Sequence, residues 1–322
     1  MKKKLFGFIS AILMLTLLGC GGASSSEKKE VHFADAGWDS NRVHNAIAGF
    51  IMENAFGYTW SEMPGSTPIL HEALKSGEID IHMEEWTDNI SSYYPDLKAG
   101  LFKELGTNYD DNRQGLYVPK YVIEEMAPDL KTVKDLLKYK DLFKDDEKPD
   151  KGRIYGAIPG WEIDSIMAKK FAAYGFEKDF VYFSPGSDAA LSAAFTSAYE
   201  KKQPIVGYYW EPTWLLGKYE FVLLEDEPYD VALFPQGKTA APSVKVTIGM
   251  SNKFAEKAPE IVEFFNKYHT SSEFTSKALA HMQETGADYK ATAKWFLKEH
   301  DDLLDKWLDK EKAELVRKAL NK

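Results

Sequence analysis

The 322-residue sequence has a single cysteine, Cys20, so it can form no internal disulfide and no cysteine-based metal site. Its seven histidines are scattered, without the spacing of a metal-ligating motif. A Walker A loop, a Gly-x-Ser-x-Gly nucleophile motif and a dinucleotide fingerprint are also absent. Basic patches are missing: the formal charge is −10, and removing residues 1–19, which hold three lysines and no acidic residue, leaves −13. We therefore expect no metal, no cofactor, no nucleic-acid partner and no enzymatic activity.

The N-terminus has the features of a targeting segment. Three lysines at positions 2–4 precede an apolar stretch, Leu5–Leu18, which is too short to be a good membrane span. The stretch ends in Leu17-Leu18-Gly19-Cys20, the pattern of a bacterial lipobox, in which the cysteine thiol accepts a lipid. We predict a signal peptide at residues 1–19, lipidation at Cys20, and a flexible tether at residues 20–29. An ordinary signal peptide that ends near a cysteine is the alternative.

Two segments of the chain repeat one another. The first runs from Val31 to Trp86 and the second from Ile154 to Trp210, and each is expected to form strand–helix–strand–helix–strand. Three anchor pairs agree in order and spacing: Trp38 and Trp161 are 123 residues apart, Ser66 and Ser187 are 121 apart, and Trp86 and Trp210 are 124 apart. A unit of this kind builds a parallel sheet with helices on its faces.

The repeat predicts an α/β protein of two doubly wound lobes with a ligand cleft between them. The chain should cross to the second lobe near 115–119, return between 229 and 243, and rejoin the first lobe through a strand at 244–250. The predicted boundaries are 30–116 for the first part of lobe 1, 117–238 for lobe 2, and 239–322 for the rest of lobe 1. The helical pattern after Pro259 is expected to pack on lobe 1.

Four of the eight tryptophans stand at or just past predicted strand ends, where open parallel sheets bind ligands. They are Trp38, Trp86, Trp161 and Trp210. Each lobe therefore offers two tryptophans to a shared cleft. We expect Trp60 in a core strand and Trp295 and Trp307 in helix packing, while the role of Trp214 stays open.

A cluster of tryptophans suits a quaternary ammonium, which cannot donate hydrogen bonds and is attracted to aromatic faces. A sugar also stacks on tryptophan, but sugar sites usually need many polar side chains that reach the hydroxyls. The segments at the cleft edge are mostly aromatic and acidic, as in Glu84-Glu85-Trp86-Thr87-Asp88-Asn89. The sequence thus favours a quaternary ammonium.

In its lipobox and in the segments Gly37–Ser40, Gly115–Pro119 and Gly207–Pro212, the sequence resembles the glycine betaine, choline and proline-betaine binding proteins of ABC importers. The resemblance covers nearly all of the chain after Cys20. It implies the type II periplasmic-binding-protein fold, in which two lobes joined by two crossovers close around the ligand by a hinge motion. Because the sequence has no Walker A loop, the ATPase and the permease must be other chains. The lipobox predicts that the protein, expected to be a monomer, is held by its lipid on the outer face of the cytoplasmic membrane.

The resemblance further implies an aromatic box of the four cleft tryptophans, with Tyr117 as a candidate fifth wall. A betaine carboxylate would be held by the backbone N–H groups of Glu162 and Ile163, and Asn89 is the candidate polar donor beside the box. The remaining candidates are Asp39 and Ser40, next to Trp38. Asp39 and Glu162 would favour a ligand with a hydroxyl and a net positive charge, which choline has. Choline, carnitine and trimethylamine N-oxide are therefore kept as alternatives to glycine betaine. A surface sensor whose closure is read by a signalling partner is an alternative role.

Overall fold

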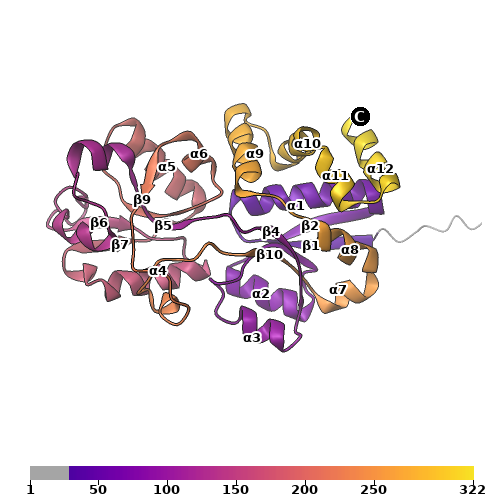
Figure 1. Cartoon of the computed structure of the whole chain (residues 1–322), viewed down its shortest axis with the longest axis horizontal. Coiled ribbons are helices and arrows are strands. Elements are labelled where there is room, and N and C mark those ends of the chain that lie inside the picture. Colours follow the sequence, from indigo (N-terminus) through magenta and orange to yellow (C-terminus); the bar gives the residue numbers. More distant parts are fainter. Residues whose placement is uncertain (1–28) are drawn as a thin grey trace, which may run out of the picture.

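The computed structural model describes residues 29–322. The predicted signal peptide, Cys20 and the tether up to residue 28 lie outside the described residues, and Lys29 is already the first residue of a strand. Within residues 29–322, no helix combines the length and the apolar character that a membrane span requires. The chain forms two α/β lobes that lie side by side (Figure 1), each built on a five-stranded sheet.

The sheet of lobe 1 contains the three strands of the first repeat, and the sheet of lobe 2 contains those of the second. Its strand order is β2 (Tyr58–Pro64), β1 (Lys29–Asp35), β3 (Ile81–Trp86), β10 (Val246–Met250) and β4 (Lys103–Tyr109). The sheet of lobe 2 has the order β7 (Phe180–Phe183), β6 (Gly152–Tyr155), β8 (Gly207–Trp210), β5 (Gln114–Pro119) and β9 (Phe221–Leu223). The three strands of each repeat pair in the same relative positions, β2-β1-β3 and β7-β6-β8, as the internal repeat predicts.

Both sheets are mixed: the repeat strands form the parallel unit that the sequence predicts, and antiparallel strands from outside the repeats extend it. The repeat strands are mutually parallel, but β10 runs antiparallel to β3 and β4, and β5 runs antiparallel to β8 and β9. Each of these strands follows a crossing between the lobes, so no helical crossover on the same sheet forces it to be parallel. The whole of β5 belongs to the second sheet, although the predicted lobe boundary at 116/117 would divide it.

Helices cover both faces of each sheet. In lobe 1, α1 (Asp39–Ile51) and the last four helices of the chain lie on one side of the sheet, and α2 (Thr67–Ser76) and α3 (Tyr93–Lys98) lie on the other (Figure 1). The C-terminal helices are α7 (Asn252–Lys257), α8 (Pro259–Lys267), α9 (Ser272–Thr285), α10 (Tyr289–Glu299), α11 (Asp302–Trp307) and α12 (Lys310–Leu320). Lobe 2 contains α4 (Glu162–Ala173), α5 (Asp188–Glu200) and α6 (Trp214–Lys218).

The tryptophans outside the predicted cleft set have packing roles. Trp307 is buried and stacks on Tyr268 with ring centroids 4.4 Å apart, and Trp295 stacks on His281 at 4.3 Å. Trp60 meets Phe33 edge to face at 6.0 Å in the core of lobe 1. Trp214, left open by the sequence, packs against the hydrophobic cores of both lobes.

Candidate functional site

The cleft tryptophans enter the site from equivalent positions in the two repeats. Trp38 follows β1 and is the N-cap residue of α1, while Trp161 follows β6 and is the N-cap residue of α4. A glycine with positive φ precedes each of them, Gly37 at +91° and Gly160 at +97°, a conformation that glycine adopts readily. Trp86 and Trp210 are the last residues of β3 and β8. These turns deliver two tryptophans from each lobe to one place.

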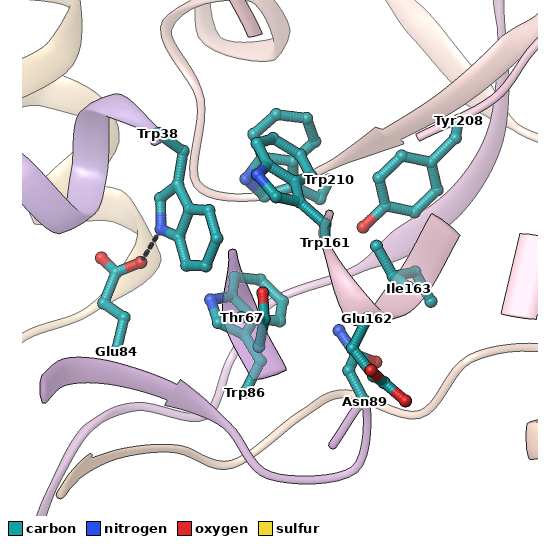
Figure 2. A pocket seen from close by; sticks show the side chains of 10 residues that line it. All are labelled: Trp38, Thr67, Glu84, Trp86, Asn89, Trp161, Glu162, Ile163, Tyr208 and Trp210. Carbon is teal, nitrogen blue, oxygen red and sulfur yellow. Dashed lines mark hydrogen bonds between the residues drawn. The ribbon is translucent and has the colours of Figure 1, made fainter. Parts of the chain in front are cut away.

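The four rings enclose a cavity between the lobes. All four are buried in the closed cleft, with exposed fractions between 4% and 9%. Trp161 meets Trp38 at a centroid distance of 5.1 Å and an interplanar angle of 84°, and it meets Trp210 at 4.9 Å and 89°. Rings that meet at right angles form adjacent walls of a box, and Figure 2 shows them around a common space. The geometry presents several π faces to one occupant.

The lobes touch each other directly at this site. The indole N–H of Trp161, from lobe 2, donates to the carbonyl of Ala36 in lobe 1 at 3.2 Å. The backbone N–H of Thr67 donates to the carbonyl of Gly160 at 3.0 Å. A Cβ at position 160 would lie 3.2 Å from the Cβ of Ser66, so a side chain there would crowd the lobe contact. The described conformation is therefore a closed one, in which a wall of the cavity also joins the lobes.

A buried carboxylate stands at one end of the cavity. Glu84 lies two residues before Trp86 on β3, has an exposed fraction of 1%, and lines the cavity. Its Oε2 accepts hydrogen bonds from the indole N–H of Trp38 (Figure 2) and from the hydroxyl of Ser40, the latter at 3.1 Å. Burial raises the pKa of Glu84 to about 7, and the bonds from Trp38 and Ser40 partly offset that effect.

Polar groups stand at the other end of the cavity. Glu162 and Ile163 are the first residues of α4, and Trp161 supplies no side-chain cap, so the free N–H groups of that helix end are available to an acceptor. Asn89 exchanges hydrogen bonds with Gln114, whose Oε1 also accepts from the Tyr208 hydroxyl at 2.9 Å. The positive end of the α4 dipole favours a negative group at this end.

The structure brings together seven of the ten predicted ligand-binding residues. Lining the cavity are Trp38, Trp86, Trp161, Trp210, Glu162, Ile163 and Asn89. Sequence reasoning missed Thr67, Glu84 and Tyr208, which also line it. Glu84 and Tyr208 each precede a cage tryptophan by two residues, and residues two apart on a strand share a face, so that spacing could have identified both.

Tyr117 does not line the tryptophan cavity, which corrects the expectation that it forms a fifth wall of the box. On β5, Gln114 and Leu116 stand opposite Trp210 and Tyr208, whereas Tyr117 stands opposite Gly207. Because alternate residues of a strand face opposite sides of the sheet, Tyr117 points away from the cavity. Its ring lines a separate surface hollow, and the aromatic residue that joins the tryptophans is Tyr208, stacked on Trp210 at 5.9 Å.

Asp39 and Ser40 do not line the tryptophan cavity. They lie in the first turn of α1 and line a neighbouring cavity, which shares Trp210 with the first and also contains Asp188. Asp39 accepts a hydrogen bond from the Tyr289 hydroxyl at 2.8 Å, and Ser40 is bonded to Glu84. Their side chains are turned toward protein partners because the helix starts at Asp39, one residue after Trp38.

The fold and the enclosed interlobe cavity define a two-lobed solute-binding protein. The chain belongs to the family described as the substrate binding domain of ABC-type glycine betaine transport systems, whose family model matches residues 29–299. It is thus a substrate-binding protein of an ABC transport system, and the resemblance read from the sequence is confirmed.

Solved structures share the fold at low sequence identity. A glycine betaine, L-proline ABC transporter binding protein (ProX) from Borrelia burgdorferi matches with a TM-score of 0.72 and 20% identity, over 89% of this chain and 100% of that one. An ABC-transporter choline binding protein in complex with choline matches with a TM-score of 0.73 and 20% identity, over 90% and 98%. Lactococcal OpuAC, closed and complexed with glycine betaine, matches with a TM-score of 0.69 and 19% identity, over 87% and 99%.

Proposed function

We propose that the cavity captures a small quaternary-ammonium solute, glycine betaine first, with choline, carnitine and trimethylamine N-oxide as alternatives. The observation that carries the proposal is the set of four tryptophans, whose rings meet near right angles around one buried space. Each desolvated cation–π contact contributes about 2 kcal/mol, so several faces acting together supply useful affinity. Within residues 29–322, no lysine or arginine lies over a cage ring; Lys290 lies over Trp60 instead. The rings are free for a cation from outside.

The two ends of the cavity match the two ends of a betaine. The ammonium group fits between the tryptophans, and the carboxylate fits the free N–H groups at Glu162 and Ile163, with Asn89 beside them. Choline would place its hydroxyl at the same end, where Glu162 can accept a hydrogen bond. The matches to betaine-bound and choline-bound structures support both ligands at the level of the fold.

Calorimetry of the purified protein with glycine betaine, choline, carnitine and trimethylamine N-oxide tests the proposal. At least one should bind with heat that saturates at one ligand per chain, and 3,3-dimethylbutan-1-ol, the uncharged isostere of choline, should bind at least tenfold more weakly. No binding of any of the four would refute the proposal. Equal binding of choline and its isostere would show that the rings select shape and not charge.

We also propose that the protein works as a monomer, lipid-anchored through Cys20 on the extracytoplasmic face, without enzymatic activity, and delivers its ligand to separate permease and ATPase chains. The lipobox pattern supports the anchor, and the family supports the delivery. The division into lobes at 30–116, 117–238 and 239–322 stays a prediction. Replacing Cys20 with serine should release the protein from the membrane fraction, and retention there would contradict the anchor.

A further inference from the structure

Glu84 is a buried acid that has no cationic partner within residues 29–322. Its exposed fraction is 1%, and its Oε1 has no hydrogen-bond partner among the described residues. Oε2 accepts hydrogen bonds from two neutral donors, the indole N–H of Trp38 and the hydroxyl of Ser40. A buried charge is costly unless it is paired, so an ionised Glu84 needs a counter-charge from another source.

The titratable groups around Glu84 do not supply that charge. His44 of α1 lies 3.9 Å from Oε1, but burial lowers its pKa to about 3, and its ring nitrogens bond to hydroxyls of Tyr268 and of a threonine. Burial likewise lowers the pKa of His82, whose Nδ1 lies 3.2 Å from the Glu84 backbone nitrogen. Tyr109 of β4 and Tyr268 have strongly raised pKa values because they are buried, so both stay neutral.

Arg42, the arginine of α1, is engaged with other residues and does not pair with Glu84. Arg42 bonds to Asp35 at 2.9 Å and lies over the Tyr289 ring. The cavity that Glu84 lines is the one in which a quaternary ammonium is proposed to bind. The ligand's own positive charge is therefore the partner that this carboxylate lacks.

We propose that Glu84 is the counter-charge of the ligand's ammonium group, and that binding a cation releases a proton from Glu84 to the buffer. This inference rests on the proposed function. The carboxylate acts in two ways. It attracts the cation directly across a medium of low dielectric. It also accepts the Trp38 indole N–H, and an anionic acceptor polarises that ring so that its face attracts a cation more strongly.

The direction of the proton coupling follows from burial. In the empty site burial raises the pKa of Glu84 to about 7, so a substantial part of the protein carries a neutral Glu84 at neutral pH. A bound cation favours the ionised form and lowers that pKa, and affinity therefore rises as the pH rises through 7. A lowering by about one unit corresponds to about a tenfold gain in affinity. An uncharged isostere gains nothing.

Replacing Glu84 by glutamine tests whether Glu84 acts through its charge or only by holding Trp38 in place. The amide oxygen of Glu84→Gln can still accept from Trp38 and Ser40, so the ring stays in place while the charge is lost. Glu85→Gln is the matched control: Glu85 is an equally buried neighbour on the same strand, but it faces His71 of α2 at 3.4 Å and not the cavity. Thermal unfolding establishes that each variant folds.

The experiment is calorimetry with tetramethylammonium, choline and glycine betaine from pH 5.5 to 8.5, in buffers of different ionisation enthalpy. We expect the wild-type protein and Glu85→Gln to bind about tenfold more tightly at pH 8.5 than at pH 5.5, and to release protons. Glu84→Gln should bind about tenfold more weakly at pH 8.5, with a flatter profile. Asp188 of lobe 2 lines a cavity with Asp39 of lobe 1, and burial and that neighbour raise its pKa, so closure can add a proton there. The difference between wild type and Glu84→Gln at each pH therefore isolates the contribution of Glu84.

A second measurement needs no variant. On addition of tetramethylammonium at pH 6.5, the infrared difference spectrum of the wild-type protein should lose a protonated-carboxyl band and gain a carboxylate band. Binding with neither a spectral change nor a difference in proton release between wild type and Glu84→Gln would overturn this inference alone. Absence of binding by the wild-type protein to all three ligands at every pH would overturn the proposed function itself.

Discussion

Trp161 is the residue whose removal should most weaken ligand binding, because it is both a wall of the cavity and a contact between the lobes. Its ring meets Trp38 of the other lobe at 5.1 Å, and its indole N–H donates to the Ala36 carbonyl at 3.2 Å. Both contacts join lobe 1 to lobe 2, so they form only when the cleft closes. The contact with Trp210 lies within lobe 2 and is present whether the cleft is open or closed.

The magnitude for Trp161→Ala follows from the contacts that depend on closure. The cation–π contact contributes up to about 2 kcal/mol, the hydrogen bond to Ala36 about 0.5–1.5 kcal/mol, and the edge-to-face pair with Trp38 about 0.5–1.5 kcal/mol. Together these reach about 3–5 kcal/mol, which is a weakening of binding by two to three and a half orders of magnitude. Trp161→Phe keeps a ring face but loses the hydrogen bond, and should cost about 1 kcal/mol, or roughly fivefold.

The assay is calorimetry with the tightest ligand of the panel, together with small-angle scattering of the ligand-free protein. Trp295→Ala is the control, since Trp295 lies on α10 and stacks on His281 far from the cavity. The alanine variant at position 161 should also populate a more open form without ligand. If its dissociation constant stayed within threefold of the wild-type value, the assignment of Trp161 to the cage would be refuted.

Three other changes test the packing and the buried charges of the two lobes. In Gly49→Ala, the new Cβ would lie 2.4 Å from Cε2 of Trp60. The overpacking should lower the free energy of unfolding by about 1–3 kcal/mol, and with it the melting temperature, without changing ligand affinity. An unchanged melting temperature would contradict that packing. Lys170→Met leaves the Asp226 carboxylate buried without its ion-pair partner, and urea titration should show a loss of about 3–5 kcal/mol. Burial raises the pKa of Asp188 to about 7 from an ordinary 3.8, so its neutral form contributes stability that is fully present below pH 3.8 and lost as the pH rises through 7. Asp188→Asn should therefore melt above the wild type at pH 8 and level with it at pH 4, and equal melting at both would contradict the shift.

The internal repeat allowed the lobes and the cage to be predicted from sequence. Equivalent strands end at equivalent edges of the two sheets, so residues that follow those strands must meet in the cleft. This reasoning placed Trp38 and Trp161 at the starts of two helices, and Trp86 and Trp210 at the ends of two strands, where the structure has them. The four cavity tryptophans could be predicted because the argument used the order of strands and helices along the chain, and did not require knowing which strands pair.

Features that depend on strand pairing were out of reach. The direction of β5 and β10 is set by the lobe crossings, and nothing in their apolar patterns distinguishes a parallel from an antiparallel neighbour. Without that direction, the face on which Tyr117 lies could not be assigned. Glu84 is a different case, since its spacing of two from Trp86 already places both side chains on one face.

The repeat also gives the cavity an orientation. Glu84 and Tyr208 hold equivalent positions, each two residues before the tryptophan that ends a repeat, so one lobe offers an acid where the other offers a neutral phenol. Figure 2 shows Glu84 beside Trp38, with Glu162 and Ile163 at the far side of the cavity. The positive end of the α4 dipole lies on that far side. A dipolar ligand is therefore favoured in one direction only, with its ammonium group toward Glu84 and its carboxylate toward the start of α4. Because Glu84 faces the ammonium group, Glu84→Lys should abolish binding of both betaine and choline.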